Sequence, residues 1–281
     1  MGIIAADFFN QGRLDLFITH LRNEHATYYR NLGDAQFTDV TASLGLDATT
    51  RPYTGFGTGA IDYDNDGWLD IFATNGDVQI SEQQLHAGIS VPLRQRSLLF
   101  RNTGGTTPGF TAVSDGEFLA VEDVGRGAAF ADLDNDGDTD ILISNNNGPV
   151  RLLLNQTGQD NHWLGVRLLD GAGGSAQTAG ALVWLERSGQ PSQMRRAGTD
   201  GSYLTSGDPR LLFGLGSSAD AGTVRVQWRG GQEEVWHDLV PDRYYPLQKG
   251  TGRSLSTTTP RDAGDPAHPA HPAHPASESL P

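Results

Sequence analysis

The sequence contains no cysteine and no long apolar run. Without cysteine the chain forms no disulfide, performs no thiol catalysis and builds no cysteine-ligated zinc site. A membrane-spanning helix needs about 18 or more consecutive apolar residues, and the sequence has no such run. The first ten residues also lack the basic region and the apolar length of a signal peptide, so export cannot be inferred from them.

Positive charge is scarce as well. Lys and Arg number 20 against 34 Asp and Glu, which gives a formal net charge of −14. Nucleic acids and anionic membranes reward basic patches, so we expect neither as a partner. Glycine is abundant, with 36 of 281 residues against an average of about 7%. This excess favours a turn-rich β architecture.

Much of the acidity lies in two nine-residue segments of pattern D-x-D-x-D-G-x-x-D, residues 62–70 (the second loop) and 132–140 (the third loop). Carboxylates this close repel one another unless a cation neutralises them. Calcium takes six to eight oxygen ligands in flexible geometry, and the glycine permits the tight bend that turns them inward. The predicted Ca²⁺ ligands are Asp62, Asp64, Asp66 and Asp70 with the backbone carbonyl of Trp68, and Asp132, Asp134, Asp136 and Asp140 with that of Asp138.

An EF-hand shares the start of this pattern, but it needs a bidentate Glu at position 12 and a helix after the loop. Position 12 is Ala73 in one segment and Ile143 in the other. The residues that follow each loop, 69–74 and 140–144, are short β-rich apolar runs that end in turn residues. We therefore expect each loop to join two strands, and a merely solvated Asp-rich turn is the alternative.

The loops belong to a longer repeating unit with up to four short strands. A first unit begins near Gly2 and carries a degenerate loop at residues 7–15 (the first loop), where Phe9 replaces one carboxylate. Only Asp7 and Asp15 remain there, with Gln11 as a possible neutral ligand, so we expect a weak or empty calcium site.

A four-stranded antiparallel unit in tandem is typical of a β-propeller blade. With Leu-Phe-Arg-Asn at 99–102 and Phe-Thr-Asp-Val at 37–40, the units resemble FG-GAP or VCBS repeats, which implies propeller blades that bind calcium. Three units do not close a ring, since propellers have four to eight blades. We expect missing upstream blades, or else an open stack that pairs with another chain.

The pattern changes after residue 155, where the Asp loops stop. Apolar runs at 163–168, 181–185, 211–213, 223–228, 233–236 and 244–247 predict a small β-sandwich. Asn-His-Trp-Leu at 161–164 and Phe-Gly-Leu-Gly at 213–216 resemble the ASPIC/UnbV domain, and the whole order resembles the cartilage acidic protein 1-like family. The predicted fold is all-β, with FG-GAP/VCBS repeats over 1–158, an ASPIC/UnbV domain over 159–250 and a disordered Pro/Ala/His-rich tail over 251–281.

The other polar residues of this domain show no pattern typical of a catalytic site. His162 and His237 are expected to be structural rather than catalytic, because no partner set is identifiable for either. Asp200 and Asp208 are expected in turns. The pair Arg195 and Arg196 is expected on an exposed strand face, with anion binding as the alternative.

These features favour a calcium-binding, non-enzymatic interaction module with an unknown protein or glycan ligand. The resemblance implies a secreted, periplasmic or cell-surface location and a role in adhesion. One alternative is a carbohydrate-active enzyme or its substrate-binding part, although every clustered carboxylate already has a calcium role and no acid–base pair remains. Another is a structural subunit that pairs through an open propeller edge.

Overall fold

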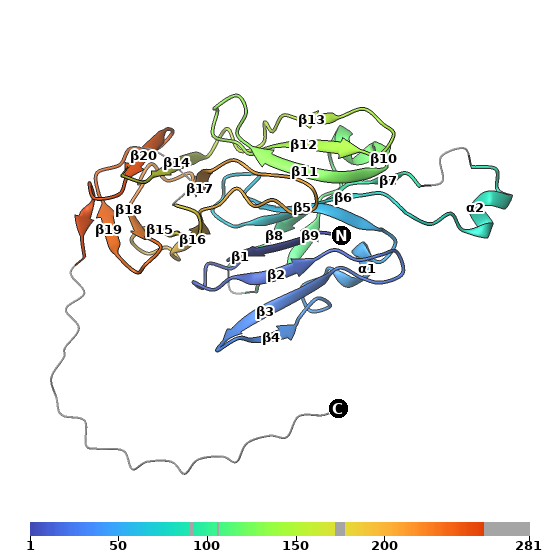
Figure 1. Ribbon diagram of the computed structural model, residues 1–281, viewed down its shortest axis with the longest axis horizontal. Helices are drawn as coiled ribbons and strands as arrows, with labels where there is room; N and C mark the ends of the chain where they lie inside the picture. Colours follow the sequence, from blue (N-terminus) through green and yellow to red (C-terminus); the bar gives the residue numbers. More distant parts are fainter. Residues whose placement is uncertain (90–92, 106, 172–177, 256–281) are drawn as a thin grey trace, which may run out of the picture.

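The computed structural model describes residues 1–89, 93–105, 107–171 and 178–255, and these form an all-β protein (Figure 1), which confirms the predicted fold class. Its helices are short: α1 (Asp47–Thr50), α2 (Glu82–His86) and the 3-10 turn η1 (Glu117–Ala120). Within the described part of the chain no helix has the length and apolar character to cross a bilayer.

Two four-stranded antiparallel sheets form the first and second blades. Their strands, in chain order, are β1 (Ile3–Ala6), β2 (Asp15–Ile18), β3 (Thr27–Gly33) and β4 (Gln36–Asp39), then β5 (Gly55–Ile61), β6 (Asp70–Asn75), β8 (Leu98–Asn102) and β9 (Phe110–Ala112). Within each blade the strands are neighbours in sequence order, the up-and-down arrangement that short connections favour.

The third blade has three strands, β11 (Gly125–Ala131), β12 (Asp140–Asn145) and β13 (Arg151–Leu153). Within the second blade, between β6 and β8, the chain makes a polar excursion that carries α2. The excursion is closed by a two-stranded ladder of β7 (Gln95–Arg96) and β10 (Glu122–Asp123). In Figure 1 this arm projects from the side of the blades.

Apolar side chains from facing blades pack the blades together. One buried cluster joins the first and second blades and includes Phe17, Tyr28 and Phe100. Another joins the second and third blades and includes Phe72 and Ile141. The innermost strands β1, β5 and β11 lie side by side, with β5 in the middle. The three blades are therefore a partial propeller.

The far face of the third blade remains uncovered among the described residues. Leu142 on β12 pairs with Leu152 on β13, and both are exposed together with Val150 and Leu154. A sheet face with several exposed leucines marks an interaction surface. Further blades or another chain could pair with this face.

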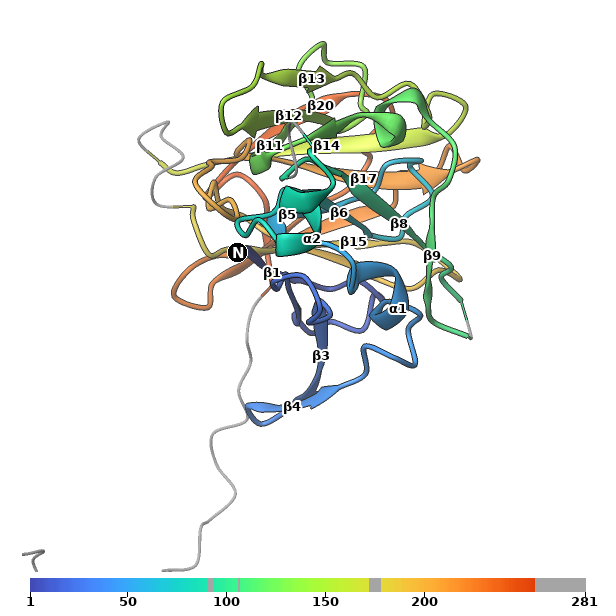
Figure 2. The same ribbon diagram turned by 90° about the vertical axis from the view of Figure 1, so that its right-hand side faces the viewer.

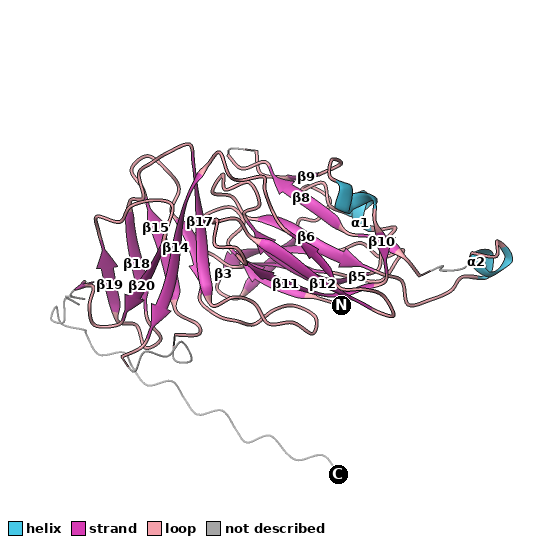
Figure 3. Ribbon diagram, turned by 90° about the horizontal axis from the view of Figure 1, so that it is seen from above, coloured by secondary structure: helices cyan, strands magenta, loops and turns pink. Residues whose placement is uncertain are grey.

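The C-terminal region forms two sheets that pack face to face (Figure 3). The strands are β14 (His162–Leu169), β15 (Leu182–Glu186), β16 (Gln193–Arg196), β17 (Arg210–Gly216), β18 (Thr223–Gln227), β19 (Glu233–Trp236), β20 (Tyr244–Gln248) and β21 (Arg253–Ser254). One sheet has the order β17-β14-β20 and the other β16-β15-β18-β19-β21. A single buried cluster lies between them and includes Val166, Val183 and Phe213, as the prediction of a sandwich requires.

A segment of this C-terminal region, residues 198–209, enters the space beside the innermost strands of the blades. The Thr205 hydroxyl donates to the Ala128 carbonyl at 3.1 Å, and the backbone N–H of Asp208 donates to the Phe130 carbonyl at 3.2 Å. The two parts of the chain are thus closely packed, as the perpendicular view also shows (Figure 2). The predicted tail lies largely outside the described residues, which end at residue 255.

Candidate metal centres

The second and third loops each connect the two innermost strands of a blade, β5 to β6 and β11 to β12. Their glycines, Gly67 and Gly137, have φ values of +95° and +94°. Residues with a Cβ rarely adopt this conformation. The glycine therefore permits the same tight coil in both loops, and the coil gathers the acidic side chains of each loop.

The first carboxylate of the second and of the third loop is buried, and only one of its two oxygens accepts a hydrogen bond. Asp62 and Asp132 are 6% and 2% exposed. Oδ2 of each accepts a backbone N–H, from Gly67 at 2.9 Å and from Gly137 at 3.0 Å. Oδ1 of each is buried with no hydrogen-bond partner within the described structure. Because an unpaired buried charge is costly, these two oxygens are suited to bind a cation.

Each loop brings three carboxylates close enough to share one ion. Oxygens within 4.8 Å of one another come from Asp62, Asp64 and Asp70 in the second loop, and from Asp132, Asp134 and Asp136 in the third. These are six of the side chains that the sequence assigned to calcium; Asp66 and Asp140 fall outside the tight groups. Oxygen-only donor sets of this kind fit hard divalent cations.

Burial and mutual repulsion raise the pKa values of several acids in these loops. Burial raises the pKa of Asp62 to about 7; Arg195 lowers it, and the neighbouring carboxylates of Asp66 and Asp64 raise it again. Burial, followed by repulsion from nearby carboxylates, also raises the pKa of Asp138 to about 7. Deprotonation of such groups is unfavourable unless a positive charge is supplied, as a bound metal would do.

The last carboxylate of each loop ties the loop to the outer strands. Asp70 Oδ1 accepts the backbone N–H of Asn102 at 2.7 Å, and Asp140 Oδ1 accepts that of Asn155 at 2.8 Å. The other oxygen of each accepts a backbone N–H from within the same loop. A carboxylate oxygen has a second lone pair, so these contacts leave room for a metal. The Leu-Phe-Arg-Asn motif ends in Asn102, but the sequence by itself does not reveal this contact.

The two residues predicted to offer backbone carbonyls lie in equivalent turns. The N–H of Trp68 donates to Asp66 Oδ1, and that of Asp138 donates to Asp136 Oδ1, each at 3.0 Å. The Asp138 side chain is itself buried: its Oδ1 accepts Asn65 Nδ2 at 2.7 Å, and its Oδ2 has no hydrogen-bond partner in the described part of the chain. This contact links the second loop directly to the third.

The first loop has the same backbone shape but is closed by protein groups. Asp7 accepts the backbone N–H groups of Gln11 and Gly12, one on each oxygen, at 2.8 and 2.7 Å. Asp15 accepts the Tyr28 hydroxyl at 2.6 Å and a backbone N–H of β3 at 2.7 Å. The Gln11 side chain lies at the exposed surface. All four oxygens of Asp7 and Asp15 thus have donors, whereas Asp62 Oδ1 and Asp132 Oδ1 have none within the described structure.

Phe9 occupies the position of the lost carboxylate and is buried. It packs against Tyr28 and Phe110, with ring centroids 6.1 and 5.6 Å apart. The Arg30 guanidinium lies 5.4 Å from the Phe9 centroid. An aromatic cluster with a stacked cation therefore stands where the other loops gather carboxylates.

The two intact loops also form the surface on which the C-terminal region rests. Asn161 Nδ2 donates to the Asp64 carbonyl at 2.7 Å, and the N–H of Gly216 donates to the Asn65 carbonyl at 2.8 Å. The Tyr244 hydroxyl donates to Asp132 Oδ2 at 2.6 Å. These contacts cannot be predicted from the sequence, because their partners lie 97 to 151 residues apart and no local pattern signals them.

The prediction of an exposed strand face at Arg195 is wrong. This side chain lies on β16 and is only 8% exposed. Its guanidinium lies 5.2 Å from the Phe213 ring centroid, and its charge acts on Asp62, Asp7 and Asp70. Burial lowers the pKa of Arg195, and those carboxylates oppose this shift. The C-terminal region therefore places a fixed positive charge beside the first and second loops.

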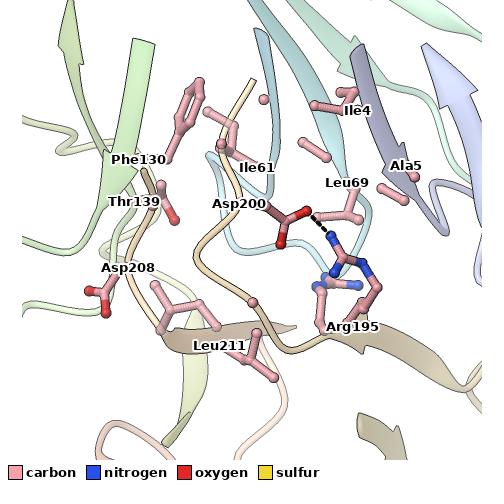
Figure 4. A pocket seen from close by; sticks show the side chains of 18 of the residues that line it. Ile4, Ala5, Ile61, Leu69, Phe130, Thr139, Arg195, Asp200, Asp208 and Leu211 are labelled. Atoms are coloured by element: carbon pink, nitrogen blue, oxygen red, sulfur yellow. Dashed lines mark hydrogen bonds and ion pairs between the residues drawn. The ribbon is translucent and has the colours of Figure 1, made fainter. Parts of the chain in front are cut away.

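A cavity of about 450 Å³ lies between the innermost strands and the segment that enters beside them. Figure 4 shows apolar Ile61 and Leu69 on one side and Asp200 and Asp208 facing them from the C-terminal region. These two acids are paired, Asp200 with Arg196 and Asp208 with Arg210. The cavity is lined by these ion pairs, by apolar groups and by Asp7, Asp62 and Asp132, the first carboxylates of the three loops.

The two candidate histidines lie elsewhere. His162 Nδ1 is 2.7 Å from Asp242 Oδ2, and His237 Nδ1 is 3.1 Å from the Thr223 hydroxyl. Neither histidine lines the cavity. Each of the described aspartates with a raised pKa lies in one of the three loops. The described aspartates with raised pKa values therefore all lie in the candidate metal loops.

Comparison with known proteins supports both parts of the fold. Residues 7–73 match the model of the FG-GAP-like repeat, and residues 171–254 match that of ASPIC and UnbV. Cartilage acidic protein 1 of Homo sapiens is 26% identical over 237 residues, which cover 82% of this chain and 33% of that protein. The Mus musculus protein is 26% identical over 276 residues, 94% of this chain and 39% of that protein.

The chain spans about a third of the length of the curated relatives that it matches. The similarity nevertheless crosses both regions of the fold in the order that the motifs predict. The chain thus combines a segment that matches the FG-GAP-like repeat model with a C-terminal segment that matches the ASPIC and UnbV model, and it is similar to cartilage acidic protein 1.

Proposed function

We propose that the chain is a calcium-binding, non-enzymatic interaction module that acts outside the cell. The observation that carries the calcium proposal is the pair of buried, partnerless oxygens, Asp62 Oδ1 and Asp132 Oδ1, each within a group of three carboxylates. Oxygen donors of this kind suit calcium, which accepts flexible coordination, better than magnesium, which demands near-ideal octahedral geometry.

Calcium would be held in the second loop by Asp62, Asp64 and Asp70 and in the third by Asp132, Asp134 and Asp136. The remaining predicted ligands, Asp66 and the Trp68 carbonyl in one loop and Asp140 and the Asp138 carbonyl in the other, would complete the donor sets. When bound, the ion supplies positive charge that cancels repulsion between the ligands, and it stabilises the folded blades because unfolded loops offer no formed site. The first loop, with Asp7, Gln11 and Asp15, would stay empty.

The extracellular interaction role rests on the family similarity and on the exposed sheet face described above. The names of the relatives describe an acidic protein of cartilage and do not mention a ligand. Rigid blades that present loops and an open apolar face suit the binding of a protein or glycan partner. Calcium sites of extracellular modules have dissociation constants of about 10⁻⁴–10⁻³ M, whereas cytosolic sensors are at about 10⁻⁷–10⁻⁵ M.

The test is a thermal melt in millimolar calcium against excess EDTA, combined with calcium titration calorimetry. We expect a large calcium-dependent rise in Tm, binding of about two ions per chain for the two intact loops, and affinity in the extracellular range. Absence of both binding and a Tm shift would overturn the calcium proposal. A submicromolar dissociation constant would leave the metal sites intact but contradict the extracellular assignment.

A second candidate is a structural subunit that pairs through its open blade face. Exposed Leu142, Val150, Leu152 and Leu154 favour it. Light scattering of the intact chain and of a Leu142→Lys, Leu152→Lys variant measures this role directly. A concentration-dependent dimer that the double variant abolishes would support pairing, and a monomer at all concentrations would contradict self-pairing.

A further inference from the structure

The third loop is held from outside by two side chains of the C-terminal domain. The Tyr244 hydroxyl donates to Asp132 Oδ2 at 2.6 Å. Arg210 donates to the Asp132 backbone carbonyl and, through Nη1, to Asn135 Oδ1 at 2.6 Å. These contacts join residues 75 to 112 positions apart, so they exist only when the domain is docked on the loop.

We propose that Tyr244 is a positioning residue for Asp132 and that, through it, docking of the C-terminal domain strengthens calcium binding in the third loop. This inference rests on the proposed calcium function. It adds a coupling between two domains that neither the motif nor the family similarity states.

The phenol ring of Tyr244 is itself held in place. It stands at the start of β20, next to β14 in the same sheet. The Arg210 guanidinium lies 4.5 Å from its ring centroid, and the Trp163 ring lies 5.0 Å away. Contacts of this kind restrict the ring, so the hydroxyl is presented to Asp132 in a defined direction.

The hydroxyl sets the orientation of the carboxylate. Asp132 Oδ2 accepts from both Tyr244 and the backbone N–H of Gly137, while Oδ1 is buried without a donor in the described structure. Two donors on one oxygen fix the carboxyl plane and leave the other oxygen for the ion. Hydrogen bonds to the far side of a metal ligand orient it and change metal affinity by about 10- to 100-fold.

The Tyr244 hydroxyl has a single proton to donate, and Asp132 Oδ2 receives it at 2.6 Å. The neighbouring acids and bases that face it are Asp132, Asp208 and Arg210.

The second loop serves as an internal control for the effect of Tyr244 on the third loop. Asp62 Oδ2 accepts the backbone N–H of Gly67 at 2.9 Å, and among the described residues no side-chain hydroxyl is recorded on this carboxylate. The two loops share ligand chemistry, but the second loop has Arg101 paired with Asp64 and Asp66 and lacks the hydroxyl donor that Tyr244 supplies to the third. A change at Tyr244 should therefore affect the third loop and leave the second loop unaltered.

The experiment titrates calcium into the full chain by calorimetry, one loop at a time. Asp64→Asn disables the second loop and isolates the third, and Asp134→Asn does the reverse. In the Asp64→Asn background we expect Tyr244→Phe to weaken calcium binding about 10- to 100-fold. In the Asp134→Asn background we expect no change.

Tyr245→Phe is the matched control, because its hydroxyl accepts the N–H of Val240 at 2.8 Å and does not contact the loop. It should leave both affinities unchanged. Arg210→Lys, which weakens the hold on the Tyr244 ring, should lower third-loop affinity by a smaller factor, and it keeps the test open if Tyr244→Phe fails to fold.

The outcomes separate this inference from the function on which it rests. Unchanged third-loop affinity in Tyr244→Phe overturns the inference and leaves the calcium proposal standing. Equal weakening in both backgrounds also overturns it, since that result indicates general loosening of the domain contact. Absence of binding to either loop of the unaltered chain overturns both.

Discussion

The first and third loops have the same backbone turn but balance their charges differently. In the first loop each oxygen of Asp7 and Asp15 receives a donor from the protein. In the third loop Asp132 and Asp138 keep buried oxygens without donors. On the proposed calcium function, the third loop would need a cation, whereas the first loop, with Phe9 in place of a ligand, would not.

A tyrosine hydroxyl donates to an aspartate in both loops, but with different consequences. Tyr28 donates to Asp15, whose other oxygen also has a donor. Tyr244 donates to Asp132, whose other oxygen has none in the described structure. The same hydrogen bond therefore closes one carboxylate and leaves the other open to a ligand. Four predictions sharpen this comparison.

The largest effect is expected from Phe9→Ala in the first loop. Removal of this buried ring should lower the free energy of unfolding by about 3–5 kcal/mol, because it leaves a cavity against Tyr28 and Phe110. Denaturant unfolding with calcium and with EDTA should give the same loss. Phe37→Ala, at a ring that is 43% exposed, is the control. A loss that appears only with calcium would show that the first loop is not metal-independent.

Asp132→Asn in the third loop should lower stability chiefly when calcium is present. With calcium at about 100 times its dissociation constant, loss of the site should remove about 2.7 kcal/mol of stability. In EDTA the change should be small, because the substitution also removes a repelled buried charge. Paired melts of this variant and of Asp115→Asn, an exposed acid outside the loops, measure the difference. Equal destabilisation in both conditions would count against metal ligation, and Asp62→Asn tests the second loop likewise.

Tyr28→Phe should cost about 1–3 kcal/mol, since Asp15 would keep a buried oxygen with no donor. The loss should be the same in calcium and in EDTA, unlike that of Tyr244→Phe. Tyr29→Phe on the same strand is the control, with an expected change within about 0.5 kcal/mol. Chemical unfolding curves provide the values. A calcium-dependent loss at Tyr28 would erase the distinction between the two hydroxyls.

The smallest expected effect is that of a change in pH on the stability of the metal-free protein. Asp62 and Asp138 have folded pKa values of about 7, above the ordinary value of about 3.9. The metal-free folded state therefore holds protons that the unfolded state releases, so its stability falls as pH rises from about 4 to about 7. Melts in EDTA across this window should show falling Tm, while the gain from calcium grows because ligands must lose protons. Rising Tm in EDTA across the window would contradict these shifts.

Local patterns predicted most of the strands. The strands before and after each Asp loop are present, as are those of the C-terminal runs, because period-two alternation and turn residues act locally. The apolar runs of the sequence did not mark β16 or β21, although Arg195 and Arg196 of β16 were expected on a strand face. In β16 the run Gln-Met-Arg-Arg has no apolar alternation, and Arg195 is buried because carboxylates of other loops lie nearby.

The candidate metal ligands could also be predicted from the local sequence, because the spacing of the aspartates alone gathers their carboxylates around a glycine. What the sequence could not give was the surroundings of each loop. Whether a carboxylate keeps a free oxygen depends on donors such as Tyr28 and Tyr244, which reach it from other strands.

By itself, the sequence determined the β class, the repeating blade, the Asp loops and the change of pattern near residue 155. Those features follow from spacing along the chain, which sets turns and alternation. The tertiary structure decided that the C-terminal domain rests on the metal loops, that Arg195 is buried beside them and that Tyr244 reaches Asp132. These contacts depend on how sheets pack, and packing brings together residues that share no local signal.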